Sequence, residues 1–175
     1  AGQINFADGT SMRAHVMVWA AGVTSSPAIY DLNVPTEGFR LKTEQTLQIS
    51  NYPYIWAVGD CAGAKGANGR FLPQVAPVAM QQGRFVADQI KRVTQGLPLK
   101  EFIYKDKGSM ATIGRHKAII QVKKLKISGP VAWFGWLFLH LFYLMGGRNR
   151  IGTIADWTWN YLTFDRGNRH IMDSL

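Results

Sequence analysis

The sequence predicts an α/β fold that ends in an apolar helical tail, and three observations carry this prediction. An apolar stretch from Ile55 to Val58 ends abruptly in Gly59-Asp60, and a loop and a helix follow it. Apolar or alternating runs between residues 102 and 123 are typical of antiparallel strands. From Pro130 the chain is apolar almost without interruption, which is typical of a helix buried in protein or lipid.

Composition narrows the classes of partner. The 175 residues include 20 Lys and Arg against 11 Asp and Glu, a formal charge of +9, so an anionic partner is expected. Many basic residues flank the apolar run, and no basic helix or aromatic-plus-basic strand of the RNA-binding kind is visible. This pattern favours an anionic membrane surface over nucleic acid. The single cysteine, Cys61, excludes an internal disulfide and a multi-cysteine metal site, and is more simply a packed residue than a nucleophile.

The N-terminal residues predict a hairpin. Residues 3–6 and 13–19 flank Asp8-Gly9-Thr10, and the second strand enters Ala20-Ala21-Gly22. That small-residue turn is either a close approach of backbone to a nucleotide or a tightly packed strand end. Because the chain opens directly on a strand, we expect it to be a piece of a longer protein. Residues 23–45 are predicted to be connecting loop, with a short strand near 47–49.

Asp60 is the first candidate functional residue. A carboxylate at the C-terminal end of a buried parallel strand lies where α/β sheets bind ligands. An ionised Asp only accepts hydrogen bonds, so it suits a ligand hydroxyl such as a ribose or ribityl oxygen. The alternative is that Asp60 caps the following turn. The loop over 62–70 lacks both G-x-x-x-x-G-K-[ST] and G-x-G-x-x-G, which argues against a phosphate cradle.

A helix is predicted from near Ala76 to about Val93. Pro77 is tolerated in a first turn, and Gly96-Leu97-Pro98 stops the helix. The pattern divides the helix into an apolar side and a polar side: Ala79, Val86 and Ile90 against Gln82, Arg84 and Lys91. The helix N-terminus is expected near Asp60, where its N–H groups can face an anion.

Two or three antiparallel strands are predicted over 102–106, 109–113 and 117–123. The apolar run over 131–145 is 15 residues, or roughly 22 Å, which is marginal for a span. Basic residues stand on both sides of it, so an in-plane or shallow re-entrant segment fits better. An amphipathic segment follows over 153–163. The aromatic residues predicted at the membrane interface are Trp133, Trp136, Phe138, Phe142, Trp157 and Trp159. The alternative is that both segments are core helices of a soluble protein. In either case His140 is expected to be a hydrogen-bonded packing residue and not a ligand.

Five motifs in this order resemble the type II NADH dehydrogenases, single-subunit flavoproteins bound to one face of a membrane. The motifs are VWAAGV at 18–23, IWAVGD at 55–60, QQG at 81–83, DKGSMATIG at 106–114 and WTWNYLTF at 157–164. The Gly-Asp motif is shared by many flavoproteins, whereas the KGSMATIG segment with the aromatic tail is highly specific. The likeness covers essentially the whole chain.

The resemblance implies part of a two-dinucleotide-binding-domain, Rossmann-like FAD/NAD(P)-binding flavoprotein. Residues 1–23 would end the NADH domain, 24–127 would form the closing half of the FAD domain, and 128–175 would be membrane-anchoring helices. The implied activity is hydride transfer from NADH to FAD, then transfer of two electrons to a membrane quinone. Both Gly-rich dinucleotide fingerprints are missing from these residues, so we expect the chain alone to be inactive.

By the same resemblance, Gly22, Gly59 and Asp60 contact the cofactor, with Asp60 on the ribityl chain. The helix start at Ala76, Pro77 and Val78 would face the pyrimidine end of the flavin. The family's Ala-Gln-x-x-x-Gln quinone pattern falls on Ala76 to Gln81, with Pro77 in place of the first Gln, so the quinone site would rest on Pro77 and Gln81. No protein nucleophile or metal is implied.

The expected location is peripheral, on the cytoplasmic face of a bacterial inner membrane, with a second copy of the chain as a further candidate partner. Two rivals stay open. One is a soluble flavoprotein reductase with a protein acceptor, and the other is a docking or dimerisation module that is not catalytic.

Overall fold

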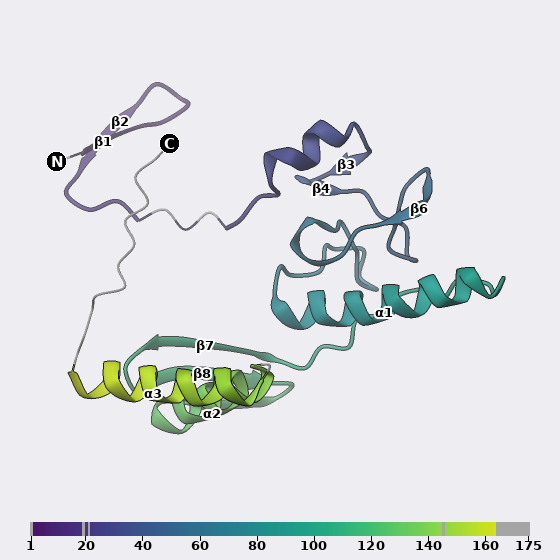
Figure 1. The fold of residues 1–175 in the computed structure, drawn as a ribbon. Coiled ribbons are helices and arrows are strands. Elements are labelled where there is room, and N and C mark those ends of the chain that lie inside the picture. Colours follow the sequence, from purple (N-terminus) through teal and green to yellow (C-terminus); the bar gives the residue numbers. More distant parts are fainter. Residues whose placement is uncertain (1, 19, 21, 145, 164–175) are drawn as a thin grey trace. The chain divides into compact units, whose positions relative to one another are not determined.

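The computed structural model describes residues 2–18, 20, 22–144 and 146–163, and these form a mixed α/β structure (Figure 1). The chain divides into two compact units, Ala1–Lys105 and Asp106–Leu175, called unit 1 and unit 2 below. The α/β class expected from the sequence is confirmed. The assignment of 1–23, 24–127 and 128–175 to parts of a larger enzyme stays a prediction.

Unit 1 begins with the predicted hairpin. Strand β1 (Gly2–Asn5) pairs antiparallel with β2 (Ser11–Ala14), from Gly2 opposite Ala14 to Asn5 opposite Ser11. The second strand was expected to continue to residue 19, but it ends at Ala14. The pairing with β1 is described as far as Gly2 opposite Ala14, and Val16, beyond it, is 79% exposed.

The segment expected to be plain loop over 23–45 contains more structure than that. A 3-10 helix η1 covers Pro27–Leu32, and a small hairpin pairs β3 (Thr36–Glu37) with β4 (Arg40–Leu41). Lys65 bonds Glu37 at 2.6 Å, and the Lys65 ammonium and the Arg40 guanidinium lie 5.4 and 5.1 Å from the Phe71 ring centroid. These pairs stabilise a segment for which composition alone predicted no regular structure.

The apolar stretch before Asp60 is β6 (Tyr52–Trp56), and its environment differs from the expectation. It pairs antiparallel with β5 (Gln48–Ile49) through a tight connection in which Asn51 has a φ of 70°. The sequence predicted a buried parallel strand, yet Tyr54 is 82% and Ile55 is 46% exposed. Within the described part of the chain β6 pairs with β5 alone, so it is an edge strand of a two-stranded sheet and not a central parallel strand.

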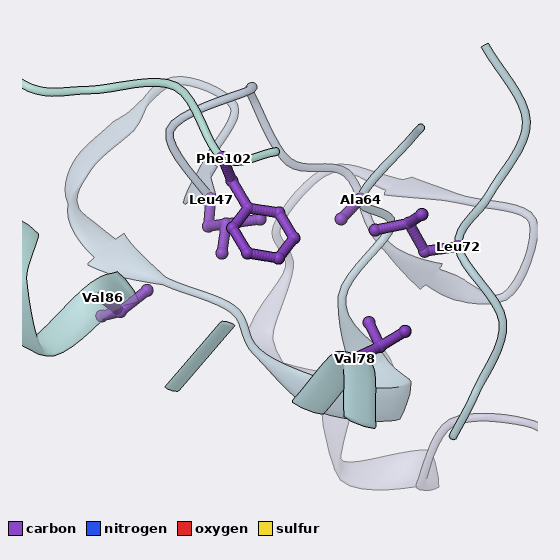
Figure 2. Packing of buried hydrophobic residues seen from close by; sticks show 6 residues of the cluster. All are labelled: Leu47, Ala64, Leu72, Val78, Val86 and Phe102. Atoms are coloured by element: carbon purple, nitrogen blue, oxygen red, sulfur yellow. The ribbon is translucent and has the colours of Figure 1, made fainter. Parts of the chain in front are cut away.

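Helix α1 (Ala76–Thr94) begins and ends close to the predicted residues. It carries one side of the core of unit 1: Val78 and Val86 project from it, and Leu47, Ala64, Leu72 and Phe102 come from the segments that cover it (Figure 2). Phe102 lies in an extended segment, not in the strand predicted over 102–106. Its N–H donates to the Gln45 carbonyl at 2.8 Å, and Lys105 of the same segment bonds the Gln81 side chain, so these contacts and burial hold the segment in place of a ladder.

Unit 2 is a three-stranded antiparallel sheet with helices. Its strands are β7 (Ser109–Gly114), β8 (Lys117–Val122) and β9 (Leu125–Ser128), in the order β7-β8-β9. Helix α2 (Pro130–Tyr143) packs on β8, with Ala132 fully buried, and α3 is Gly147–Thr163. The third strand is thus 125–128 instead of 102–106. Among the described residues, none of the helices combines the length and apolar character needed to cross a bilayer.

Candidate functional site

The candidate site of unit 1 is the tight turn that follows β6. Gly59–Cys61 form a 3-10 turn, η2, closed by a hydrogen bond of 3.1 Å from the Ala62 N–H to the Gly59 carbonyl. Gly59 has a φ of 77°, which is unfavourable for any residue with a Cβ. The turn packs on α1, and a Cβ built on Gly59 would lie 3.7 Å from the Ala79 Cβ. The sequence therefore needs glycine here for backbone conformation.

Two glutamines hold this turn from outside. The Gln82 Oε1 accepts a hydrogen bond from the Gly59 N–H at 2.6 Å, and the Gln74 Nε2 donates to the Asp60 carbonyl at 3.0 Å. Gln82 is only 1% exposed. The sequence placed Gln82 on the polar side of the helix, and that placement is wrong. The buried residues of α1 are Val78, Gln82, Val86 and Gln89, and this spacing is the signal that would have found it.

The Asp60 carboxylate is exposed and has no hydrogen-bond or ion-pair partner among the described residues. The turn that contains it is closed by the carbonyl of Gly59, and among the described residues no hydrogen bond gives the Asp60 side chain the capping role that was the alternative. An ionised carboxylate in this state can accept hydrogen bonds from the hydroxyl groups of a ligand.

The start of α1 carries the predicted trio Ala76, Pro77 and Val78. Val78 already donates its N–H to the Val75 carbonyl at 3.0 Å, and Pro77 has no N–H. Among the described residues the Ala76 N–H has no acceptor, and the first turn contains no acidic residue. The positive end of the helix dipole is therefore not neutralised by a side chain of its own turn.

Gln81 stands one turn after Pro77, and both its amide nitrogen and its amide oxygen bond Lys105. Its Nε2 donates to the Lys105 carbonyl at 3.0 Å, and its Oε1 accepts from the Lys105 N–H at 3.1 Å. This paired contact fixes the end of the segment after Phe102 against α1. The remaining predicted residue, Gly22, is exposed with a φ of 87°, and no atom lies within 4 Å of the position of an added Cβ.

The candidate site of unit 2 is an apolar groove of about 780 Å³ between α2, α3 and the sheet. Six of its fourteen lining residues are aromatic. The Trp136 ring stacks on His140 at 3.8 Å between centroids and lies 6.3 Å from Trp157, and Trp133 stacks on His116 at 5.1 Å. The His140 Nδ1 also lies 2.8 Å from the Trp136 carbonyl, so His140 is a hydrogen-bonded packing residue, as expected.

The residues predicted at a membrane interface fall into two groups. Trp133, Trp136 and Trp157 are half-buried in the groove, so they build the unit. The others are largely exposed: Phe138, which also lines the groove, is 72%, Phe142 63% and Trp159 65% exposed. On α2 the exposed apolar residues recur at helical spacing and form one stripe, called the α2 stripe below: Val131, Phe134, Phe138 and Phe142.

Two arginines of unit 2 bind helix ends. The Arg115 Nη2 donates to the Tyr161 carbonyl at 2.8 Å in the last turn of α3, and Arg150 donates to the Leu144 and Phe142 carbonyls at 2.9 and 3.0 Å. Helix C-termini leave carbonyls unpaired and carry partial negative charge, so guanidinium groups stabilise them. Beside Arg115, the His116 Nε2 lies 2.9 Å from the Tyr161 hydroxyl. Part of the basic charge after residue 100 thus has an internal role that composition does not reveal.

Two family models match the chain and together span both candidate sites. Residues 2–83 match the family described as pyridine nucleotide-disulphide oxidoreductase, which includes the Gly59–Asp60 turn and the start of α1. Residues 107–166 match the family described as the NDH2 C-terminal domain, which covers the sheet and the helices of unit 2.

Curated relatives match nearly the whole chain. The type II NADH:quinone oxidoreductase NdhA of Mycobacterium tuberculosis is 37% identical over 168 residues, which are 90% of this chain and 35% of that protein. The enzyme Ndh of the same organism is 37% identical over 95% of this chain and 37% of its own length. An internal alternative NAD(P)H-ubiquinone oxidoreductase of Solanum tuberosum mitochondria is 31% identical over 89% of this chain and 35% of its length. The chain thus spans about a third of the length of these relatives.

Solved structures agree in fold. The structure of NDH2 from Plasmodium falciparum in complex with NADH matches with a TM-score of 0.69 at 16% identity, over 87% of this chain and 46% of that one. The same protein in complex with RYL-552 matches with a TM-score of 0.68. With the two family matches and the curated relatives, the conclusion is that the chain belongs to the type II NADH dehydrogenase family and corresponds to part of the length of its members.

Proposed function

We propose that the chain is the part of an NADH:quinone oxidoreductase that closes the flavin site and docks the enzyme on a membrane. The whole enzyme would pass a hydride from NADH to FAD and then two electrons to a membrane quinone. The observation that carries this proposal is the Asp60 carboxylate beside the start of α1, which is exposed and has no partner among the described residues. The family membership of both units supports it.

The residues present fit FAD on chemical grounds. The Asp60 carboxylate can accept hydrogen bonds from ribityl hydroxyls, because no described protein group bonds its two carboxylate oxygens. The start of α1 offers the Ala76 N–H and the positive end of the helix dipole, with no acid in the first turn to offset them. When bound, FAD supplies the two-electron chemistry. The chain's own part is to orient that group and to stabilise negative charge near the helix start.

For the quinone, we propose Pro77 and Gln81 as the residues at the start of α1 nearest the acceptor. Pro77 offers an apolar ring where the family pattern has an amide. Both amide atoms of Gln81 bond Lys105, which leaves only the second Nε2 hydrogen for a quinone carbonyl. We therefore propose that Gln81 acts mainly by holding the Lys105 segment as a wall of the site.

For the membrane, we propose peripheral binding through the α2 stripe to a surface that contains anionic lipid. Its exposed phenylalanines lie on a chain with a formal charge of +9. Apolar side chains at a helix surface enter the headgroup boundary, while basic residues are attracted to anionic headgroups. We place the protein on the cytoplasmic face of a bacterial inner membrane, because its electron donor in this proposal is the intracellular nicotinamide pool. A second copy of the chain is the alternative occupant of the stripe.

The test uses the chain within its natural polypeptide, purified from membranes. We expect flavin absorbance that bleaches with NADH and returns with a short-chain quinone. Asp60→Ala should lose most of the bound flavin, while Asp88→Ala, which removes an exposed acid from α1, should retain it. A folded, membrane-bound product that never carries flavin would contradict the enzymatic proposal and favour the docking module. Activity without membrane binding would favour the soluble reductase.

A further inference from the structure

The feature with the most specific geometry outside the residues already assigned is the buried amide of Gln82. It is 1% exposed, and its Oε1 lies 2.6 Å from the Gly59 N–H. We propose that Gln82 is a positioning residue of the flavin site, which sets the direction of the Asp60 carboxylate through the backbone of Gly59. This inference rests on the proposed function and adds a residue that does not itself touch the ligand.

Asp60 is fixed from both sides. The peptide unit before Gly59 is held by Gln82, and the peptide unit after Asp60 is held by Gln74, whose Nε2 donates to the Asp60 carbonyl at 3.0 Å. Because peptide units are planar, fixing two of them restricts the backbone dihedrals between them and so the direction of the Asp60 Cα–Cβ bond. The exposed carboxylate needs such support, since none of the described side chains bonds its oxygens.

Glutamine suits this task for a physical reason. It brings an uncharged acceptor to a buried donor, which would otherwise cost about 1–3 kcal/mol when left unpaired. An ionised glutamate at the same place would bring a buried charge near the negative Asp60. A shorter amide would not span the same distance from the α1 backbone.

The chain provides a matched control in Gln89. It lies on the same buried side of α1, is 0% exposed, and its Oε1 accepts from the Lys100 N–H at 2.8 Å. Each glutamine therefore gives α1 one bond to another backbone segment, but only the bond of Gln82 reaches the Gly59–Asp60 turn. Gln82→Met and Gln89→Met each replace the amide acceptor by an apolar side chain of similar size, so both variants should lower the free energy of unfolding.

The experiment measures the Kd for FAD of flavin-depleted protein, within its natural polypeptide. We expect Gln82→Met to raise the Kd about tenfold, the effect of losing roughly one supported hydrogen bond, and Gln89→Met to change it less than about twofold. In an Asp60→Ala background, Gln82→Met should add less than about a further twofold, because the two residues act through one contact. Thermal midpoints of all variants separate stability from affinity.

Equal effects of Gln82→Met and Gln89→Met on the Kd, or independent effects of Gln82→Met and Asp60→Ala, would overturn the inference. If Gln82→Met does not fold, Gln82→Glu replaces it. A protonated glutamic acid keeps the acceptor, so FAD affinity should be near normal at low pH and fall as pH rises, and Gln89→Glu should lack this trend. A protein that binds no FAD even with every residue intact would instead contradict the proposed function.

Discussion

The two units differ in which side chains they bury and which they expose. Unit 1 buries polar groups: Gln82 and Gln89 are 1% and 0% exposed, and each accepts a backbone N–H. Unit 2 exposes apolar groups: Phe138 and Phe142 are 72% and 63% exposed. A buried amide costs free energy unless it is bonded, and an exposed apolar stripe marks an interaction surface. The contrast indicates that unit 1 is built to shape a turn and unit 2 to present a surface.

The largest expected effect concerns that surface. The double variant Phe138→Asp, Phe142→Asp should lower partitioning onto vesicles that contain anionic phospholipid by at least about 100-fold. Each phenylalanine that enters the membrane surface contributes roughly 1.5–3 kcal/mol to binding. Ile103→Asp, at a residue of unit 1 that is 77% exposed, is the control and should leave partitioning unchanged. Unchanged vesicle binding together with loss of a dimer would assign the stripe to a second copy.

A smaller effect is expected at the turn of unit 1. Gly59→Ala should lower the free energy of unfolding by about 1–2 kcal/mol, because a Cβ is unfavourable at a φ of 77°. Gly83→Ala is the matched change inside α1, where no atom lies within 4 Å of the added Cβ, and it should raise that free energy by about 0.5–1 kcal/mol. Urea unfolding measures both, and two shifts of the same sign would contradict this account.

Unit 2 offers a test of its helix ends. Arg115→Met should lower the local stability of the last turn of α3 by about 1 kcal/mol, since two carbonyls lose a guanidinium donor. Amide hydrogen exchange of α3 reports this loss. Lys117→Met removes a nearby exposed charge and should leave the exchange as it is. A similar acceleration in both variants would mean that general charge, not capping, stabilises the helix.

The smallest effect lies in the β1–β2 hairpin. The Thr10 hydroxyl at 2.7 Å and the Thr10 N–H at 2.9 Å hold the pKa of Asp8 below its ordinary value. The stability that this pair contributes is therefore present above the ordinary pKa of about 3.9 and is lost as pH falls through the lower folded-state value. Chemical shifts of Gly9 and Thr10 should follow this titration, and Thr10→Val should move the midpoint upward. If Thr10→Val leaves the titration midpoint of Asp8 unchanged, this assignment is contradicted.

The sequence predicts well what depends on local signals. Pro77 and Gly96 bound α1, Asp8-Gly9 gives the hairpin turn, and the aromatic run gives α2. Prediction from the sequence fails where a partner far away in the chain determines the direction of a side chain. The inward direction of Gln82 depends on the Gly59 N–H, 23 residues away, and Arg115 depends on carbonyls 45 and 46 residues away.

The paired glutamines of α1 also set how this region tolerates changes of length. Gln82 and Gln89 are separated by about two helical turns, roughly 10.5 Å along the axis, and each holds a different backbone segment. Adding or removing one residue between them rotates one glutamine by about 100° relative to the other, so both bonds cannot form together. Insertions there should be eliminated in a screen of random length variants, whereas the loop over 66–69 should accept them.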